Sequence, residues 1–161
     1  MSLQYVIDGY NIINHPKFIP ARRSYVSIQS ALLDFILANK FTGSNKNKIT
    51  VVFDGYPAPI ALRESGDISV VFSRRISADE KIKRMVEESA GRGSIIVVTD
   101  DGEIKCAVRA LGARVQGIEE FVKSKAGRVI SAADKEQSKD LPSYGQMQRI
   151  NEELRKLWLE N

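Results

Sequence analysis

The chain has 161 residues, of which 43% are hydrophobic and 27% are charged, a balance typical of one soluble globular domain. The net charge of +4 and the sequence pI of about 9.2 permit nucleic-acid binding but do not require it. A single cysteine, Cys106, excludes an intramolecular disulfide framework and fits a reducing compartment. No apolar run approaches the roughly 20 residues that cross a bilayer, and no signal peptide precedes Tyr5, so we expect a cytoplasmic protein.

The first predicted strand covers residues 5–7 and ends at Asp8-Gly9. This dipeptide alone would also fit a tight hairpin, because both residues tolerate positive φ. No returning strand follows, however, and a polar stretch with two prolines leads to a predicted helix over residues 24–39 with Ser24 as its N-cap. The inner face of this helix is expected to carry Ile28, Leu32, Phe35 and Ile36. The next strand, residues 49–53, completes a strand–helix–strand unit and favours parallel pairing.

The same alternation continues along the chain. Strand 68–73 precedes a helix that begins at Ser77, where Ser77 and Glu80 form a capping-box pattern. The apolar strand 95–99 precedes a helix that follows Asp101 and is expected to bury Cys106 as a small core residue. A short strand over 113–116 and a helical turn over 119–122 complete the pattern. These elements predict an α/β fold, a three-layer α/β/α sandwich with a mostly parallel sheet.

The last part of the chain differs in composition. Residues 124–142 are polar and charged, and residues 143–161 carry an amphipathic helical pattern. We therefore expect a domain over residues 1–123 and, over 124–161, a polar extension with a C-terminal amphipathic helix. The apolar stripe of that helix fits packing on the domain or on a second subunit, which leaves a homodimer open.

Three predicted strands lead to an aspartate: Asp8, Asp54 and Asp101. The carboxyl ends of parallel strands meet at one edge of a sheet, where open α/β sheets bind their ligands. Asp79 lies in the first turn of the helix after Ser77, so it is expected at the same edge. Clustered carboxylates repel one another unless they share protons or bind cations. All-oxygen donors, without a Cys/His cluster of zinc spacing, suit Mg²⁺ or Mn²⁺.

Several familiar site motifs are absent from the sequence. It contains no Walker A motif, no Gly-x-Gly-x-x-Gly fingerprint and no Gly-x-Ser-x-Gly nucleophile elbow. These absences weaken nucleotide-hydrolase, dinucleotide-binding and serine-hydrolase interpretations.

Four segments occur in order, DGYNII (8–13), VVFDG (51–55), VVFS…SADEKI (70–82) and VVTDDGEIKCAVRALGARV (97–115). Together they resemble the YacP-like NYN domains, relatives of PIN-domain nucleases, over residues 4–122. The resemblance implies a PIN-like sheet and a metal-dependent endoribonuclease that acts on RNA. Residue by residue, it implies catalytic roles for Asp8, Asn11, Asp79 and Asp101, with the three aspartates as metal ligands.

The sequence departs from the family pattern at Asp100, where the family usually has serine. Two adjacent aspartates are therefore candidates, and we prefer Asp101 because the family acid stands two residues after the threonine. Glu103 is a candidate fourth acid, although a solvated helix surface is an equal alternative. Asp54 is a further candidate metal ligand, and capping of its loop is the structural alternative.

Other polar and aromatic residues stand near these acids in sequence. Arg74 and Arg75, followed by Arg63, are the candidates for contacts with RNA phosphates. Tyr10 and Tyr56 each follow an Asp-Gly pair and are candidates for stacking on a base, with packing as the alternative. The only histidine, His15, is a candidate general base, although a metal-bound water needs none.

The leading functional hypothesis is an endoribonuclease in which the acids hold one or two Mg²⁺ or Mn²⁺ ions that activate a water for attack on an RNA phosphodiester. The alternative is a non-catalytic RNA-binding or ribosome-associated module on the same fold. A metal-dependent phosphatase would need an aspartyl nucleophile in a DxD arrangement, which Asp8-Gly9-Tyr10 lacks.

Overall fold

The computed structural model describes residues 2–20, 27–57 and 68–124. Four predicted features lie outside these ranges: the Ser24 cap, Arg63, nearly all of the polar extension and the C-terminal amphipathic helix. The predicted division of the chain after residue 123 therefore stays a prediction.

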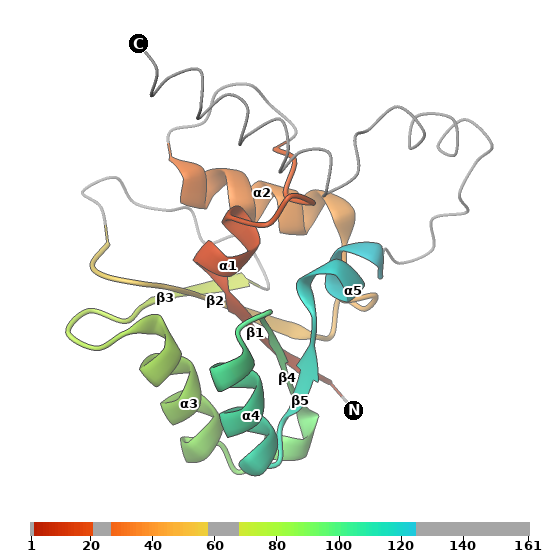
Figure 1. Cartoon of the computed structure of the whole chain (residues 1–161). Helices are drawn as coiled ribbons and strands as arrows, with labels where there is room; N and C mark the ends of the chain where they lie inside the picture. Colours follow the sequence, from red (N-terminus) through yellow and green to blue (C-terminus); the bar gives the residue numbers. More distant parts are fainter. Residues whose placement is uncertain (1, 21–26, 58–67, 125–161) are drawn as a thin grey trace, which may run out of the picture. The chain divides into compact units, whose positions relative to one another are not determined.

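Strands and helices alternate through the described residues (Figure 1). In chain order they are β1 (Gln4–Asp8), α1 (Gly9–Ile13), α2 (Ile28–Asn39), β2 (Lys48–Phe53), β3 (Ile68–Phe72), α3 (Ala78–Glu88), the 3-10 turn η1 (Arg92–Ser94), β4 (Ile95–Val98), α4 (Gly102–Ala110), β5 (Arg114–Gln116) and α5 (Ile118–Lys123).

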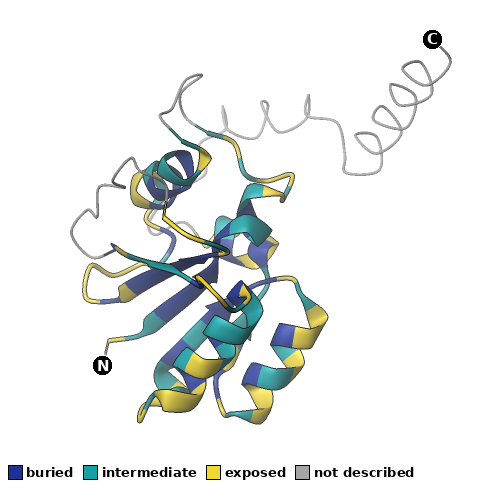
Figure 2. Ribbon diagram, turned by 90° about the vertical axis from the view of Figure 1, so that its left-hand side faces the viewer, coloured by how far each residue is buried: buried dark blue, intermediate teal, exposed yellow. Residues whose placement is uncertain are grey.

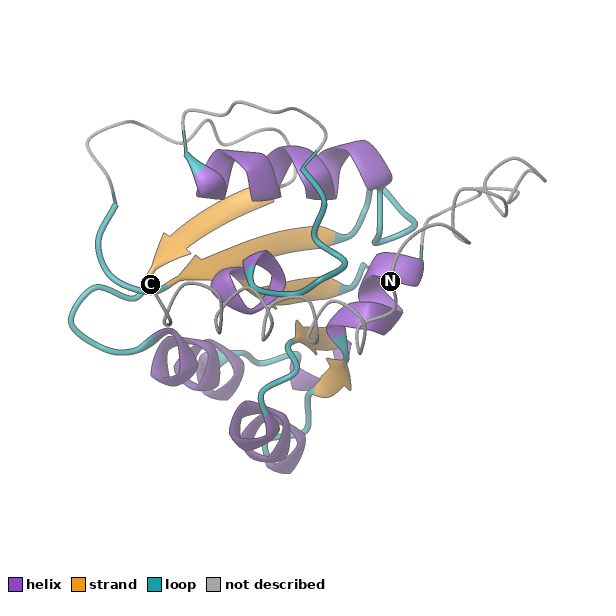
Figure 3. Cartoon of the chain, turned by 45° about the horizontal axis from the view of Figure 1, so that its top comes forward, coloured by secondary structure: helices purple, strands orange, loops and turns teal. Residues whose placement is uncertain are grey.

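The five strands form one sheet in the order β3-β2-β1-β4-β5, and every pairing is parallel. The central strand β1 pairs with β2 on one side, where Asp8 stands opposite Val52, and with β4 on the other, where Ile7 stands opposite Val98. Helices cover both faces (Figures 1 and 3). The predicted α/β sandwich is therefore confirmed.

Alternate residues of each strand feed two separate cores. Tyr5 and Ile7 point to the core under α1, α2 and α5, whereas Val6 points to the core under α3 and α4. This alternation explains why β1 is apolar on both faces, as a central parallel strand must be. Figure 2 shows the resulting buried sheet between helices with exposed outer surfaces. None of the described helices is long and apolar enough to span a membrane.

Three local predictions differ from the structure. Helix α1 follows β1 directly, where the sequence was expected to form a loop. The N-cap of α2 is Ser27, whose side chain accepts from the Ser30 N–H, so the helix begins at Ile28 and not at the predicted residue 24. Ile28, expected on the inner face of α2, is 44% exposed because it is the first residue of the helix.

Cys106 is a second correction to the predicted cores. It is exposed, because α4 directs Ile104 and Val108 against the sheet and turns Cys106, midway between them, outward. The cysteine therefore does not pack as a core residue.

The helix predicted to begin at Ser77 does so, with half of the expected capping box. The Ser77 hydroxyl accepts a 3.1 Å hydrogen bond from the Glu80 N–H. The Glu80 carboxylate bonds instead to Arg84 one turn later, at 3.1 Å. The start of α3 is thus fixed by the serine, and the glutamate stabilises the exposed face.

Candidate active site

An open pocket of about 600 Å³ lies at the carboxyl edge of the sheet, at the point where the strand order reverses. Strands β1 and β4 are neighbours here, yet the chain leaves β1 toward β2 and leaves β4 toward β5. Open α/β sheets bind ligands at such a switch point, because the connections diverge and leave a crevice. The lining residues are Asp8, Tyr10, Asn11, Asn14, Asp54, Gly55, Ser77, Ala78, Asp79 and Asp101.

Asp8, the last residue of β1, is the most buried acid of the pocket, with 7% of its surface exposed. Its pKa is raised from 3.8 to about 6, mainly by burial and in addition by the charges of Asp79 and Asp101. The Asn11 N–H and the Thr99 hydroxyl oppose this rise. The carboxylate makes no capping hydrogen bond to α1. The net effect is a raised pKa, so the charged form of Asp8 is less stable here than in water.

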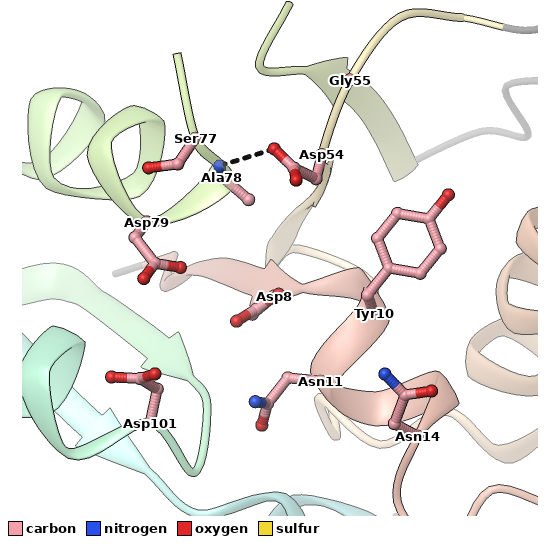
Figure 4. A pocket seen from close by; sticks show the side chains of 10 residues that line it. All are labelled: Asp8, Tyr10, Asn11, Asn14, Asp54, Gly55, Ser77, Ala78, Asp79 and Asp101. Carbon is pink, nitrogen blue, oxygen red and sulfur yellow. Dashed lines mark hydrogen bonds between the residues drawn. The ribbon is translucent and has the colours of Figure 1, made fainter.

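Asp79 approaches Asp8 from the first turn of α3 (Figure 4). Its pKa is raised by burial and by the charge of Asp101, while the ammonium of Lys83 lowers it. Lys83 itself bonds to Glu103 at 2.9 Å on the outer side of α3 and α4. Glu103, the candidate fourth acid, does not line the pocket.

Asp101 reaches the pocket from the start of α4, where it is the N-cap. Its Oδ1 accepts hydrogen bonds from the Glu103 and Ile104 N–H groups, at 2.9 and 3.1 Å. These bonds hold the carboxylate in one orientation, and Figure 4 shows it directed at the same space as Asp8 and Asp79. Three carboxylates from three separate elements thus line the same pocket.

The adjacent aspartate, Asp100, faces away from this space. Its Oδ1 accepts a 3.0 Å hydrogen bond from the Ile118 N–H at the start of α5. Its Oδ2 lies 3.6 Å from Nε2 of His15, which does not line the pocket either. The structure therefore places Asp101, and not Asp100, with the other acids.

Asp54 lines the pocket, but its carboxylate is engaged in the fold. Its Oδ1 accepts from the Ser73 hydroxyl at 3.0 Å and from the Ala78 N–H at 3.2 Å, drawn in Figure 4. These bonds tie the end of β2 to the start of α3 and help to place Asp79. The geometry matches the capping alternative for Asp54. Both hydrogen bonds use Oδ1, so Oδ2 is not engaged by them.

Asn11 joins the two central strand ends. Its Oδ1 accepts a 2.9 Å hydrogen bond from the Asp100 N–H, across 89 positions in the sequence. This bond holds the loop that carries Asp101 against α1. Asn11 thus has a structural role in addition to its place in the pocket.

Of the other predicted site residues, Tyr10 lines the pocket, whereas Arg74, Arg75 and Tyr56 do not. Arg74 and Arg75 are exposed in the loop between β3 and α3, and Arg74 adopts the left-handed conformation, with φ 60°. The Arg74 N–H bonds to the Gly55 oxygen at 2.8 Å, so this loop borders the pocket wall. Tyr56 is 63% exposed beyond the wall, and Arg63 falls outside the described residues.

The sequence matches the YacP-like NYN domain over residues 5–160. The chain belongs to the YacP-like NYN domain family. This family is nuclease-like. The match therefore extends beyond residue 122, where the resemblance seen in the sequence alone ended.

Two solved structures share the fold of this NYN domain. Rae1 (YacP) from Bacillus subtilis is 22% identical with a TM-score of 0.58, covering 100% of this chain and 96% of the other. A tryptophan-to-leucine variant of that protein is 20% identical with a TM-score of 0.58, covering 99% and 86% of the two chains. At this identity the likeness establishes the fold alone. No curated protein matches the sequence.

The chemistry of the NYN pocket fits a hydrated hard cation. Its lining includes four aspartates and no lysine, arginine, cysteine or histidine. Among the described residues, however, no three Asp, Glu, His or Cys side chains are close enough to enclose a metal ion. Mg²⁺ usually takes one or two carboxylates directly and keeps several waters, so this spacing suits it better than a dehydrated ion.

Sequence reasoning did not identify Asn14 as part of the NYN pocket. Asn14 is the C-cap of α1, and it follows Tyr10 by four positions and Asn11 by three. This spacing places the three side chains on neighbouring parts of one helical surface. The signal was missed because this segment was expected to be a loop, to which helical spacing does not apply.

Proposed function

We propose that this protein is a metal-dependent endoribonuclease that cleaves RNA phosphodiesters at the pocket. The observation that carries the proposal is the convergence of Asp8, Asp79 and Asp101 at the switch point, with the pKa of Asp8 raised to about 6. Keeping such acids ionised at neutral pH costs free energy, which a bound cation would offset. Membership in a nuclease-like family supports the same reaction class.

Asp8, Asp79 and Asp101 would hold Mg²⁺ or Mn²⁺, with the free oxygen of Asp54 as a further contact. The cation would supply a more acidic water and stabilise the leaving oxygen. The protein would fix the geometry: the α4 N-terminus orients Asp101, and Asp54 positions the α3 turn that carries Asp79. Asn11 would keep the Asp101 loop in register and offer its amide nitrogen to a phosphate oxygen.

The RNA backbone would contact Arg74 and Arg75, and Arg63 is the next candidate for such a contact. The exposed loop of Arg74 borders the pocket at Gly55, so a phosphate beside the reacting one can reach it. The competing function is RNA binding without cleavage, which the wide spacing of the carboxylates would favour. Ribosome association and a homodimer, which the sequence leaves open as alternatives, are not tested by these observations.

The test compares neighbouring aspartates in an RNA cleavage assay with Mn²⁺, Mg²⁺ or chelator. Asp8→Asn and Asp101→Asn should each lower cleavage by more than about 100-fold, since even outer-shell residues of metal sites are worth 10–100-fold. Asp100→Asn is the matched control, because the amide oxygen can still accept from Ile118 and the side chain lies outside the pocket. Cleavage that survives chelator, or equal loss in all three variants, would refute the assignment.

A further inference from the structure

The pocket has two chemically different sides. Asp79 and Asp101 lie on one side, and Tyr10 and Asn14, both uncharged, lie on the other (Figure 4). An RNA strand carries negative charge on its phosphates and none on its bases. Once a cation neutralises the acids, the phosphate belongs on the acidic side and the adjoining nucleoside on the uncharged side.

We propose that Tyr10 and Asn14 form a binding site for one unpaired nucleotide, which makes single-stranded RNA the substrate class. This inference rests on the proposed function and extends it. It assigns to the uncharged side two contacts: stacking of a base on Tyr10 and hydrogen bonding of the base edge to Asn14.

Tyr10 is held in place before any ligand arrives. Its ring packs edge-to-face with that of Phe53, with centroids 5.5 Å apart and planes at 70°. Its hydroxyl accepts a 2.8 Å hydrogen bond from Nε2 of Gln29 on α2. An aromatic ring fixed from two directions loses little conformational entropy when a base stacks on it. Because Gln29 is the donor, the hydroxyl proton of Tyr10 remains available to a ligand.

Asn14 supplies the polar partner that stacking lacks. It is exposed and follows Tyr10 by four positions, so both side chains lie on the same face of α1. Its backbone N–H donates a 3.0 Å hydrogen bond to the Tyr10 carbonyl oxygen, which fixes the backbone of Asn14. The side-chain amide takes no part in this bond. A carboxamide offers a donor and an acceptor, the combination that reads a base edge.

The size of the pocket favours a single nucleotide. Its volume of about 600 Å³ lies within the range of small-molecule sites, about 300–1,000 Å³. Bases inside a duplex are stacked and paired and cannot reach a ring at the side of such a pocket, whereas unpaired bases can be splayed onto aromatic side chains. A duplex should therefore bind only through its backbone.

The experiment measures binding of a fluorescent RNA hexamer, single-stranded or in a duplex, in Mg²⁺. All proteins carry Asp101→Asn to keep the RNA intact, so variants are compared in one background. Tyr10→Leu should weaken single-strand binding at least about fivefold, the lower bound for loss of one base–aromatic stack. Tyr10→Phe keeps the ring and should stay within about threefold. Duplex affinity should change less than twofold in both.

Tyr56→Leu is the matched control, because Tyr56 also follows an Asp-Gly pair but does not line the pocket. It should bind both RNAs like its parent. Asn14→Ala removes an exposed side chain, so it tests the site even if Tyr10→Leu fails to fold. It should flatten the differences in affinity among hexamers of A, C, G and U.

Unchanged single-strand affinity in folded Tyr10→Leu, or unchanged base preference in Asn14→Ala, would overturn the site. An equal loss for single strand and duplex would also overturn it. The result is independent of turnover. If the wild type does not cleave RNA while Tyr10 still selects single strands, the nuclease proposal fails and the nucleotide site stands.

Discussion

Three Asp-Gly pairs follow strands in this protein, and their glycines stand in three different local structures. A Cβ at Gly9 would lie 2.5 Å from a ring carbon of Phe53, so only glycine lets α1 start directly beneath that ring. Gly55 has φ +86°, a conformation that other residues rarely adopt. Gly102 meets neither constraint and is simply the first residue of α4. One dipeptide thus serves close packing, a turn and a helix start.

The burial of Asp8 predicts how stability depends on pH without metal. The folded pKa, about 6, exceeds the usual 3.8, so between these values the folded state binds more protons than the unfolded state. The stability that Asp8 contributes is fully present below pH 3.8 and is lost as pH rises through 6. From pH 5 to 7.5 its share of the loss should be on the order of 1 kcal/mol.

Asp8→Asn should remove this share and be the more stable protein at pH 7.5 in chelator. Urea unfolding at pH 5 and pH 7.5 measures the difference, with Asp100→Asn as the control that should follow the wild type. Parallel pH dependence in Asp8→Asn and the wild type would mean that Asp8 titrates normally.

The start of α3 divides its tasks among neighbouring side chains. Ser77 satisfies the Glu80 N–H, Asp54 satisfies the Ala78 N–H, and Glu80 pairs with Arg84. Asp79 is the acid of this turn that is left to face the pocket. The helix does not need Asp79 as a cap, so its role at the site can be separated from its role in the helix.

Asp79→Asn should therefore change metal binding more than stability. Without metal, loss of the favourable helix-dipole interaction, about 0.3–1 kcal/mol, is offset by relief of burial and of repulsion from Asp101. With Mn²⁺, the rise in melting temperature should shrink, because that rise reports affinity. Glu80→Gln, also in the first turn but outside the pocket, should keep the full rise. A full rise in both variants would remove Asp79 from the metal site.

At the scale of the molecule, the alternating pattern of the sequence was enough to predict the sandwich and the edge where the acids meet. Strand and helix periods report burial over many residues, and the parallel order follows from the connections. Helix α1 escaped prediction because five residues are too few to show a period. The contact of Asn11 with the Asp100 N–H could not be foreseen, since it joins residues far apart in sequence. Cys106 was misplaced because its apolar type was taken to indicate burial, although it lies off the buried stripe that Ile104 and Val108 form on α4.

Basic residues at the two ends of the sheet should differ in their effect on RNA binding. Arg74→Ala with Arg75→Ala should weaken binding and lower the slope of log affinity against log salt by about 1.4, or about 0.7 for each lost phosphate contact. Lys46→Ala with Lys48→Ala removes the same charge at the start of β2, the opposite end of the sheet from the pocket. Its slope should match the wild type. A change confined to the lysine pair would move the RNA to that end.

The central position of β1 also sets the order in which the pocket can come into being during synthesis. Gln4 pairs with Lys48 on one side and with Ile95 on the other, so β1 has no second neighbour until residues 95–98 have been made. Until then a growing chain can form only β3-β2-β1, with one side of β1 as an unprotected edge that can pair with another chain. Asp101 emerges later still. A nascent chain therefore carries the buried acid of β1 before it possesses the pocket, and its most vulnerable strand edge disappears in the same step that brings Asp8 and Asp101 together.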